Sequence, residues 1–381
     1  MSQQSSILMN KNTPILEVAV EGNSIVGTGS VLNEKMLPIQ LQDGFTLKDV
    51  QAWFSKRQIP EKREGLKEAR ILFRGFEKNS GFFSLTDQYW VKHNKNDTWN
   101  KGNFFHNHYT SSVGAAFFEP WAVDKKEIME PSPDRTTNGV LRKCWQQGED
   151  GISYLLKAGS IKFRQEPLSE VLASYTLKSL GLLPFVEYEL VIHGLRFCAK
   201  SRNFVTDSTE FVPAAAIYNK AEKPENKSIY SHLLHMCQQY NIFNAKDYID
   251  KMIVCDYVLC NSDRHLGNFG FIRSAENGMI LSFAPLFDNG SAYWGNSEDV
   301  NSVKSRLFSD VEADILKKAK EKGQLRNARS TQAMKELINS YPEIDEKKKK
   351  DIIQSVEKID LEITMSEKEE KKPRYDMEII M

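Results

Sequence analysis

A predicted apolar helix that runs directly into a polar loop is the feature that most constrains this chain. Residues 245–260 repeat apolar side chains at helical spacing, and the loop that follows has Asp263 with Asn268 five positions later. Twenty positions after Asn268, a second tight turn contains Asp288. The residues between the turns predict a hairpin over 269–283. Because a hairpin returns the chain to where it started, the two polar turns are expected to meet in one site.

The residue types in these two turns are those that phosphoryl transfer requires. An Asp with an Asn five positions later is the spacing of a kinase catalytic loop, where the carboxylate orients the acceptor hydroxyl and the amide binds Mg²⁺. Asp263 is therefore predicted to be the catalytic base, and Asn268 and Asp288 the magnesium ligands. Taken singly, Asp and Asn are ordinary turn formers, but their combination favours the functional interpretation. His265 is a candidate nucleotide-binding residue, although a bond to the loop backbone is favoured over a role in proton transfer.

A lysine and a glutamate upstream match the other half of a kinase site. Lys157 ends a predicted strand, and Glu170 lies near the start of the next predicted helix. Alone, the lysine would extend to solvent and the glutamate would complement the helix dipole. As a strand lysine followed by a helix-start glutamate, the pair repeats the arrangement that kinases use to hold the phosphates of ATP.

A short polar loop precedes the first strand of this region. Its residues are Thr136, Thr137, Asn138 and Gly139. Their backbone N–H groups could bind phosphates, or the loop could be a plain β-turn. No GxxxxGK motif is present, so the chain is not expected to be a P-loop NTPase.

Turn residues and apolar periodicity predict the remaining elements. Residues 1–13 look frayed, and a helix is expected to begin after Thr46 as its N-cap. Ser169 is predicted to cap a helix over 166–180 that ends at Gly181. A loop with helical pieces is expected over 201–226. Other predicted strands lie at 15–31, 140–145, 152–157, 186–192 and 195–199, and other helices at 61–73, 231–240, 311–320, 331–340 and 347–359.

Composition excludes several classes of function. Lys and Arg total 51, as do Asp and Glu, so no net charge attracts the chain to nucleic acid. No run of apolar residues is long enough to predict a membrane span, and no signal peptide is visible at the start. The five cysteines form no CxxC pair. We therefore expect a cytoplasmic protein without direct contact to nucleic acid or membrane.

The motifs together resemble the HipA-like serine/threonine protein kinases, a bacterial toxin-kinase family whose fold is related to that of phosphatidylinositol kinases. The resemblance covers about residues 130–295 and, more loosely, the aromatic-rich part before them. It rests on Tyr154-Leu-Leu-Lys157, Ser169-Glu170-Val-Leu-Ala-Ser174 with Leu180-Gly181-Leu182, Asn261-Ser-Asp-Arg-His-Leu-Gly-Asn268 and Pro285-Leu-Phe-Asp288-Asn-Gly290.

This resemblance implies an α+β, two-lobed, protein-kinase-like fold with a β-rich N-lobe and a helical C-lobe. An α+β subdomain would precede the two lobes. The implied boundaries are residues 1–120 for the subdomain, 121–200 for the N-lobe and 201–365 for the C-lobe, with 366–381 as a flexible tail.

The resemblance also implies ATP and Mg²⁺ as cofactors and assigns roles to the motif residues. Lys157 would contact the ATP phosphates and Glu170 would brace it. The strand through Cys198-Ala-Lys200 would lead into the adenine-binding hinge through backbone groups, which makes Lys200 a further candidate.

Partners follow from the same resemblance. The substrate would be a protein with a Ser or Thr acceptor, and an antitoxin is one possible partner. Family toxins phosphorylate a serine in their own phosphate loop. Here that region, residues 132–137, departs from the Gly-rich Ser-Gly loop of the toxins, and the N-terminal part diverges from their arrangement.

Two alternatives stay open. One is a kinase for a lipid or small-molecule hydroxyl on the same fold, although no basic membrane-binding helix is visible. The other is a degenerate kinase that acts as a regulatory binding module. The presence of all five motif residues argues against this last possibility, because a binding module has no chemical need for Asp263.

Overall fold

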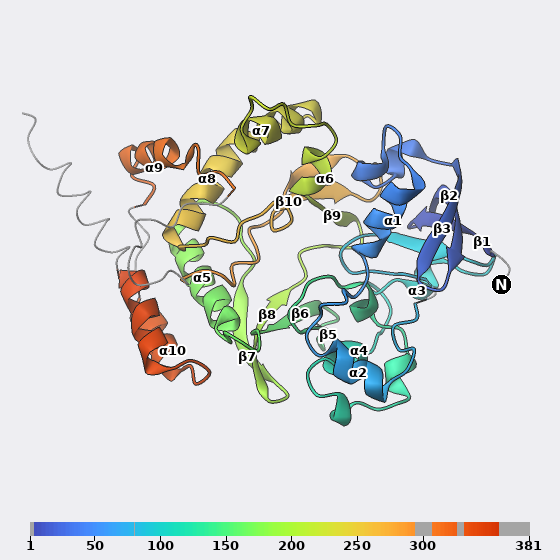
Figure 1. The fold of residues 1–381 in the computed structure, drawn as a ribbon, viewed down its shortest axis with the longest axis horizontal. Helices are drawn as coiled ribbons and strands as arrows, with labels where there is room; N and C mark the ends of the chain where they lie inside the picture. The colour runs from blue at the N-terminus through green and yellow to red at the C-terminus, as the bar shows by residue number, and fades with distance from the viewer. Residues whose placement is uncertain (1–3, 80, 294–306, 326–330, 358–381) are drawn as a thin grey trace, which may run out of the picture.

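The computed structural model describes residues 4–79, 81–293, 307–325 and 331–357. Within these residues the strands form three sheets, and the longer helices lie mostly after residue 228 (Figure 1). The predicted α+β class, with a β-rich part followed by a helical part, is confirmed. The tail predicted at 366–381 lies outside the described residues.

The N-terminal sheet has the strand order β3-β2-β1-β4, with β1 at Gln4–Asn10, β2 at Thr13–Glu21, β3 at Ser24–Val31 and β4 at Tyr89–Lys92. The prediction that residues 1–13 are frayed is wrong for residues 4–13, and residues 1–3 lie outside the described residues. β1 pairs with β2 on one side and β4 on the other, so it is an inner strand of this sheet. Helix α1, Leu47–Ser55, packs against β3 and starts at Thr46, which forms the expected cap through a capping box with Asp49.

Short helices and loops connect this sheet to the next. The predicted helix over 61–73 is confined to Leu66–Leu72, where Gly65 at φ +84° begins it. Aromatic side chains fill the spaces under the loops; for example, Phe83 stacks on Trp90 with ring centroids 5.0 Å apart. The elements are η1 (Glu34–Met36), η2 (Ile39–Leu41), α2 (Leu66–Leu72), α3 (Trp99–Gly102), α4 (Ser112–Ala115), η3 (Pro120–Ala122), η4 (Glu127–Met129) and η5 (Pro133–Thr136).

The central sheet has the order β5-β6-β8-β7, and helix α5 packs on β7 and β8. Its strands are β5 (Lys143–Gln147), β6 (Ser153–Ala158), β7 (Tyr188–His193) and β8 (Arg196–Arg202). Helix α5 spans Glu166–Leu180 and ends at Gly181, whose φ of +62° fits a glycine C-cap. Ser169 does not cap it, because the helix begins one turn earlier and its N-cap is Gln165.

The third sheet is short, with the order β11-β10-β9. The predicted hairpin appears as β10 (Gly270–Ser274) and β11 (Ile280–Phe283). Strand β9, Thr209–Pro213, lies within the stretch 201–226 that was predicted as a loop with helical pieces. Its partner is β10, far along the chain, so local sequence gave no sign of the pairing.

Helices form the rest of the described chain. They are α6 (Ala214–Tyr218), α7 (Ile229–Gln239), α8 (Ala245–Val258), α9 (Glu312–Glu321), α10 (Gln332–Ser340) and a helix over 346–357. The largest apolar cluster lies among α5 to α10 and buries most of α8. Among the described helices, none combines the length and the hydropathy that a membrane span requires.

A buried hydrogen-bonded cluster joins the N-terminal sheet to the third sheet. Arg273 on β10 donates to Glu210 on β9 at 2.7 Å and to the hydroxyl of Tyr89 on β4 at 2.9 Å. The backbone N–H of Phe211 also donates to the carbonyl of Thr86 at 3.0 Å. These contacts hold the N-terminal sheet against the third sheet.

Candidate active site

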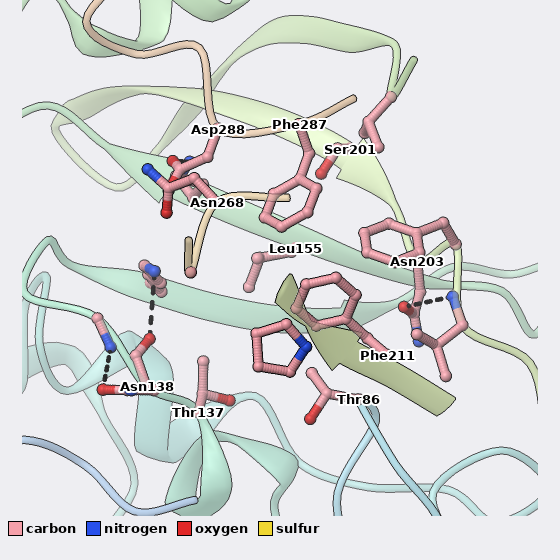
Figure 2. Close-up of a pocket in the computed structure, with 18 of the residues that line it drawn as sticks. Thr86, Thr137, Asn138, Leu155, Ser201, Asn203, Phe211, Asn268, Phe287 and Asp288 are labelled. Atoms are coloured by element: carbon pink, nitrogen blue, oxygen red, sulfur yellow. Dashed lines mark hydrogen bonds and ion pairs between the residues drawn. The ribbon is translucent and has the colours of Figure 1, made fainter. Parts of the chain in front are cut away.

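A cavity of about 820 Å³ lies between the central sheet, the third sheet and the loop after α8 (Figure 2). Ten of the eleven predicted site residues line it, and Lys200 does not. Figure 2 shows Asn268 and Asp288 on one side of the cavity and Thr137 and Asn138 on the opposite side. The ten lining residues are Thr136, Thr137, Asn138, Gly139, Lys157, Glu170, Asp263, His265, Asn268 and Asp288.

Lys157 lies at the centre of a charged cluster that connects three elements. Its Nζ on β6 donates to Glu170 on α5 at 2.6 Å and also to Oδ1 of Asp288. The second oxygen of Glu170 accepts the backbone N–H of Asn289 at 2.8 Å. The glutamate therefore fixes both the lysine and the turn that carries Asp288.

The pKa values in this cluster show which groups are charged. The ammonium of Lys157 is penalised by burial, but Asp288 and Glu170 outweigh this and raise its pKa well above the usual value. Burial also opposes the charge of Asp288, yet Lys157 and then Lys143 hold its pKa well below the usual range. For Glu170 burial dominates and raises the pKa. Lys157 and Asp288 are thus charged at neutral pH.

Asp288 occupies a backbone conformation that few residues adopt. Its φ is +59°, in the left-handed region where Asp and Asn are tolerated better than most other side chains. Its side chain is 37% exposed, so one face of the carboxylate is open to the cavity. Backbone strain of this kind is common at functional sites, where the surrounding structure keeps the residue in the strained conformation.

The loop after α8 presents Asp263 and Asn268 to the same cavity. Asp263 is exposed, and no hydrogen bond or ion pair to its carboxylate is found among the described residues. Asn268 donates its Nδ2 to the carbonyl of Asp263 at 3.3 Å, which ties the two ends of the loop together. His265 is exposed, and its Nδ1 accepts the backbone N–H of Gly267 at 3.1 Å, the structural role that the sequence favoured.

Arg264 holds the two polar turns in one arrangement. Its side chain is fully buried and pairs with Asp256 of α8 at 2.9 Å. It donates to the carbonyls of Asn268 and Phe287, both at 2.8 Å, and to Oδ1 of Asn289 at 2.7 Å. One guanidinium thus bonds to the loop of Asp263 and to the turn on both sides of Asp288. Its bonds to Phe287 and Asn289 span more than twenty positions of the chain, so sequence spacing does not reveal this function of Arg264.

Lys143 is a second cation of the site that sequence reasoning missed. It lies opposite Lys157 in the β5–β6 pair and lines the cavity. Its Nζ donates to the carbonyl of Asn138 at 3.2 Å. Burial, then the charge of Lys157, lower its pKa to about 7. Two lysines directly opposite on a sheet repel each other, so their placement favours an anionic ligand.

The loop of Thr136 to Gly139 lies at the cavity edge, but its threonine hydroxyls point into the protein. Thr136 donates to the carbonyl of Phe83 at 2.8 Å, and Thr137 accepts the indole N–H of Trp145 at 2.9 Å. Gly139 has φ +105° and its N–H donates to the side chain of Asn138. The positive φ favours glycine here, and a Cβ at Gly139, 2.1 Å from Nζ of Lys143, would displace the end of that lysine.

The end of the cavity away from Lys157 and Asp288 is apolar. Phe287 packs against Phe204 and Phe211, with ring centroids 5.5 and 5.3 Å away. Leu155 on β6 and Ala199 on β8 also line the cavity. Such a surface suits a flat heteroaromatic ring. Phe287 and Leu155 belong to predicted motifs and Ala199 to the strand expected to lead to the adenine, whereas Phe204 and Phe211 belong to none.

Lys200 is the one predicted site residue that the fold places elsewhere. It lies on β8 between Ala199 and Ser201, which both line the cavity. Because successive side chains on a strand point to opposite faces, Lys200 points away from the cavity, and its Nζ lies 4.3 Å from the ring centroid of Tyr154. The lysine side chain is therefore not part of the lining, and the adenine-binding role of this strand stays a prediction.

This chain is similar in sequence to a known kinase. No protein-family model matches the chain. The serine/threonine-protein kinase CtkA of Helicobacter pylori is 27% identical over 204 residues, which are 49% of this chain and 62% of that protein. The chain therefore matches less than two thirds of the length of this relative.

Two solved structures resemble parts or most of the fold. The crystal structure of the H. pylori proinflammatory kinase CtkA has 19% identity and a TM-score of 0.41, covering 60% of this chain and 95% of that one. HipA of Shewanella oneidensis, in a complex with HipB and operator DNA, has 12% identity and a TM-score of 0.49, covering 95% of this chain and 97% of that one. The sequence match to a serine/threonine kinase supports the resemblance to the HipA-like kinase family that the motifs predicted.

Proposed function

We propose that this protein is an ATP- and Mg²⁺-dependent serine/threonine protein kinase of HipA-like type. The observation that carries the proposal is the bonded cluster of Lys157, Glu170 and Asp288, in the same cavity as Asp263 and Asn268. The five residues come from separate parts of the chain. Their convergence provides a cation for phosphates, oxygen ligands for a metal and an unpaired carboxylate.

The residues fit the cofactors that the proposal requires. Mg²⁺ prefers oxygen ligands and is commonly held by one or two carboxylates together with substrate phosphates. The described part of the chain holds no cluster of three or more His, Cys, Asp or Glu side chains suited to a metal. The carboxylate of Asp288 and the amide oxygen of Asn268 would therefore hold the cation with oxygens of the nucleotide. When MgATP is bound, ATP would supply the γ-phosphoryl group and Mg²⁺ would neutralise part of the negative charge on the phosphates.

Each protein group then has a distinct task. Lys157 binds phosphate oxygens, and Glu170 keeps its ammonium in position. Asp263 accepts a hydrogen bond from the acceptor hydroxyl and takes its proton as the phosphoryl group departs. The apolar end with Phe204, Phe211 and Phe287 receives the adenine ring. The partner that this scheme requires is a protein with a Ser or Thr acceptor.

Replacement of Asp263 tests the base. Asp263→Asn keeps the shape of the side chain but cannot accept a proton at neutral pH, so transfer of labelled phosphate from ATP to protein should be lost. Asp314→Asn, at an exposed position on α9, is the matched control and should retain full transfer. Retention of activity in the Asp263 variant would show that another group is the base.

Replacement of Asp288 tests the metal ligand independently of turnover. ATP raises the melting temperature of a protein that binds it by mass action. Wild-type protein should be stabilised more by ATP with Mg²⁺ than by ATP alone, and Asp288→Ala should remove this difference. An unchanged Mg²⁺-dependent shift would contradict the assignment.

Autophosphorylation can be assessed in the same preparations by intact mass before and after addition of ATP. Within 132–137 the candidate acceptors are Ser132, Thr136 and Thr137, which are all buried. Their hydroxyls would have to leave these positions before they could reach Asp263. We therefore expect modification of this loop to be slow compared with transfer to an exposed acceptor.

A further inference from the structure

The active-site cavity continues beyond the proposed nucleotide site to a wall formed by the N-terminal part of the chain. Residues of η2 and α1 belong to its lining, together with the first turn of α6. We use the name α1 wall for the surface made by Gln40, Trp53, Lys56, Arg57 and Ala215. In Figure 1, α1 and α6 lie near each other.

A chain of direct contacts connects this wall to the catalytic loop. At the start of α6, the N–H of Ala215 donates to the carbonyl of Leu266, and that of Ala214 donates to the carbonyl of Phe269, both at 2.9 Å. On its other side α6 packs against η2, which carries Gln40, and η2 packs against α1. The α1 wall therefore contacts the loop of Asp263 directly through Ala215, and its remaining residues follow through η2 and α1.

The wall is fixed and nearly neutral apart from one side chain. Trp53 packs edge-on to Tyr89, with ring centroids 5.3 Å apart. Arg57 and Asp87 form a buried ion pair at 2.7 Å and so cancel each other's charge. Lys56 is exposed and has no ion-pair or hydrogen-bond partner among the described residues. It is the unpaired charge that the N-terminal part contributes to the cavity lining.

We propose that the α1 wall binds the residues that flank the acceptor Ser or Thr, and that Lys56 selects an acidic residue among them. The inference rests on the proposed function, since it names the substrate class of the same site. An extended peptide rises about 3.3 Å per residue, so an acceptor at Asp263 places its near neighbours on adjacent elements. A flexible, exposed lysine beside the otherwise neutral α1 wall attracts a carboxylate, and its side chain can reorient at little cost in free energy.

The experiment uses the full chain and a positional-scanning library of Ser/Thr peptides in which one flanking position at a time is fixed. The measured quantity is the ratio of phosphate transfer into Asp- or Glu-containing peptides to transfer into the Lys-containing peptides at the same position. Wild-type protein should favour the acidic peptides at one or more positions. Lys56→Glu should lower that ratio by up to about fivefold, the upper range for one solvent-accessible ion pair.

The ratio within one variant cancels differences in ATP turnover and in the amount of active protein. Lys48→Glu is the matched control, because Lys48 is also exposed on α1 but does not line the cavity; its ratio should equal that of the wild type. A wild type without acidic preference, or a Lys56→Glu protein that keeps it, would overturn this inference and leave the kinase proposal intact. If wild type labels no peptide but phosphorylates a lipid or a small alcohol, the protein-kinase proposal fails and the inference fails with it.

Discussion

Arg264→Lys tests whether one buried guanidinium holds the active-site loops together. Arg264 bonds to the carboxylate of Asp256 and to three neutral oxygens, those of Asn268, Phe287 and Asn289, at 2.7 to 2.8 Å. A lysine keeps the charge, but its single ammonium cannot span the carboxylate and all three oxygens. If two of these buried acceptors lose their donor, at about 1–3 kcal/mol each, the loops lose roughly 2–6 kcal/mol of local stability.

Hydrogen exchange read by mass spectrometry measures this loss where it occurs. Peptides that cover residues 261–268 and 286–290 should exchange at least ~30-fold faster in the variant, since each 1.4 kcal/mol of opening free energy corresponds to about tenfold. Phosphate transfer should fall together with this protection, because Asp263 and Asp288 would no longer be held in one arrangement.

Arg273→Lys is the matched control for this experiment. Arg273 is equally buried and also bonds to a carboxylate, of Glu210, to two carbonyls, of Lys35 and Gly278, and to one side-chain oxygen, of Tyr89. Its replacement should speed exchange near the N-terminal sheet and leave 261–268 protected. Unchanged exchange of both active-site segments in the Arg264 variant would refute the role assigned to this residue.

Three further substitutions address the phosphate side of the cavity and its support. Burial and the charge of Lys157 lower the pKa of Lys143 to about 7, so this lysine loses its positive charge as the pH rises from 7 to 8.5. ATP affinity, measured by calorimetry, should therefore weaken over this pH range, and it should weaken more in the wild type than in Lys143→Met. Gly139→Ala should weaken ATP binding, because its Cβ would meet Lys143, whereas Gly22→Ala, with φ +59° and open space, should affect stability only. Burial raises the pKa of Asp134 to about 7, above its unfolded value of 3.8, so its contribution to folding is complete below pH 4 and is lost as pH rises to 7. Between pH 4.5 and 7.5, thermal melts should therefore show a loss of stability in the wild type, of at most about 4 kcal/mol, that Asp134→Asn lacks. If the stability of both proteins changed with pH in the same way, Asp134 would not contribute to the pH dependence of folding.

The site residues that could be predicted from the sequence lie close to one another along the chain, so their spacing is enough to recognise them. Asp263 and Asn268 lie in one loop, and a hairpin connects that loop to Asp288. The lysine and the glutamate are separated by a single strand–helix connection. Local turn chemistry and periodicity are sufficient to recognise such units.

The parts that sequence missed depend on partners that are distant along the chain. Lys143 becomes a site residue only because β5 pairs with β6 in the register that sets it opposite Lys157. Strand β9 requires β10 as its partner, and β1 requires β4. Lys200 does not line the cavity, and recognising its strand does not decide which way its side chain faces. A shift of one residue in register reverses which side chains face the cavity.

The site contains two charged clusters, Arg264 with Asp256 and Lys157 with Asp288, whose exposure differs. This difference indicates different functions for the two clusters. The Arg264–Asp256 pair is almost completely buried, with 0% and 2% of the side chains exposed, and every bond of the guanidinium ends on the protein. Such a pair fixes geometry, since breaking it leaves a buried charge without a partner. In the second cluster, Asp288 is 37% exposed and its partner Lys157 is 9% exposed, so the carboxylate is the group that is open to a ligand. We therefore expect the Arg264–Asp256 pair to control where the loops lie, and the cluster of Lys157 and Asp288 to control what they bind.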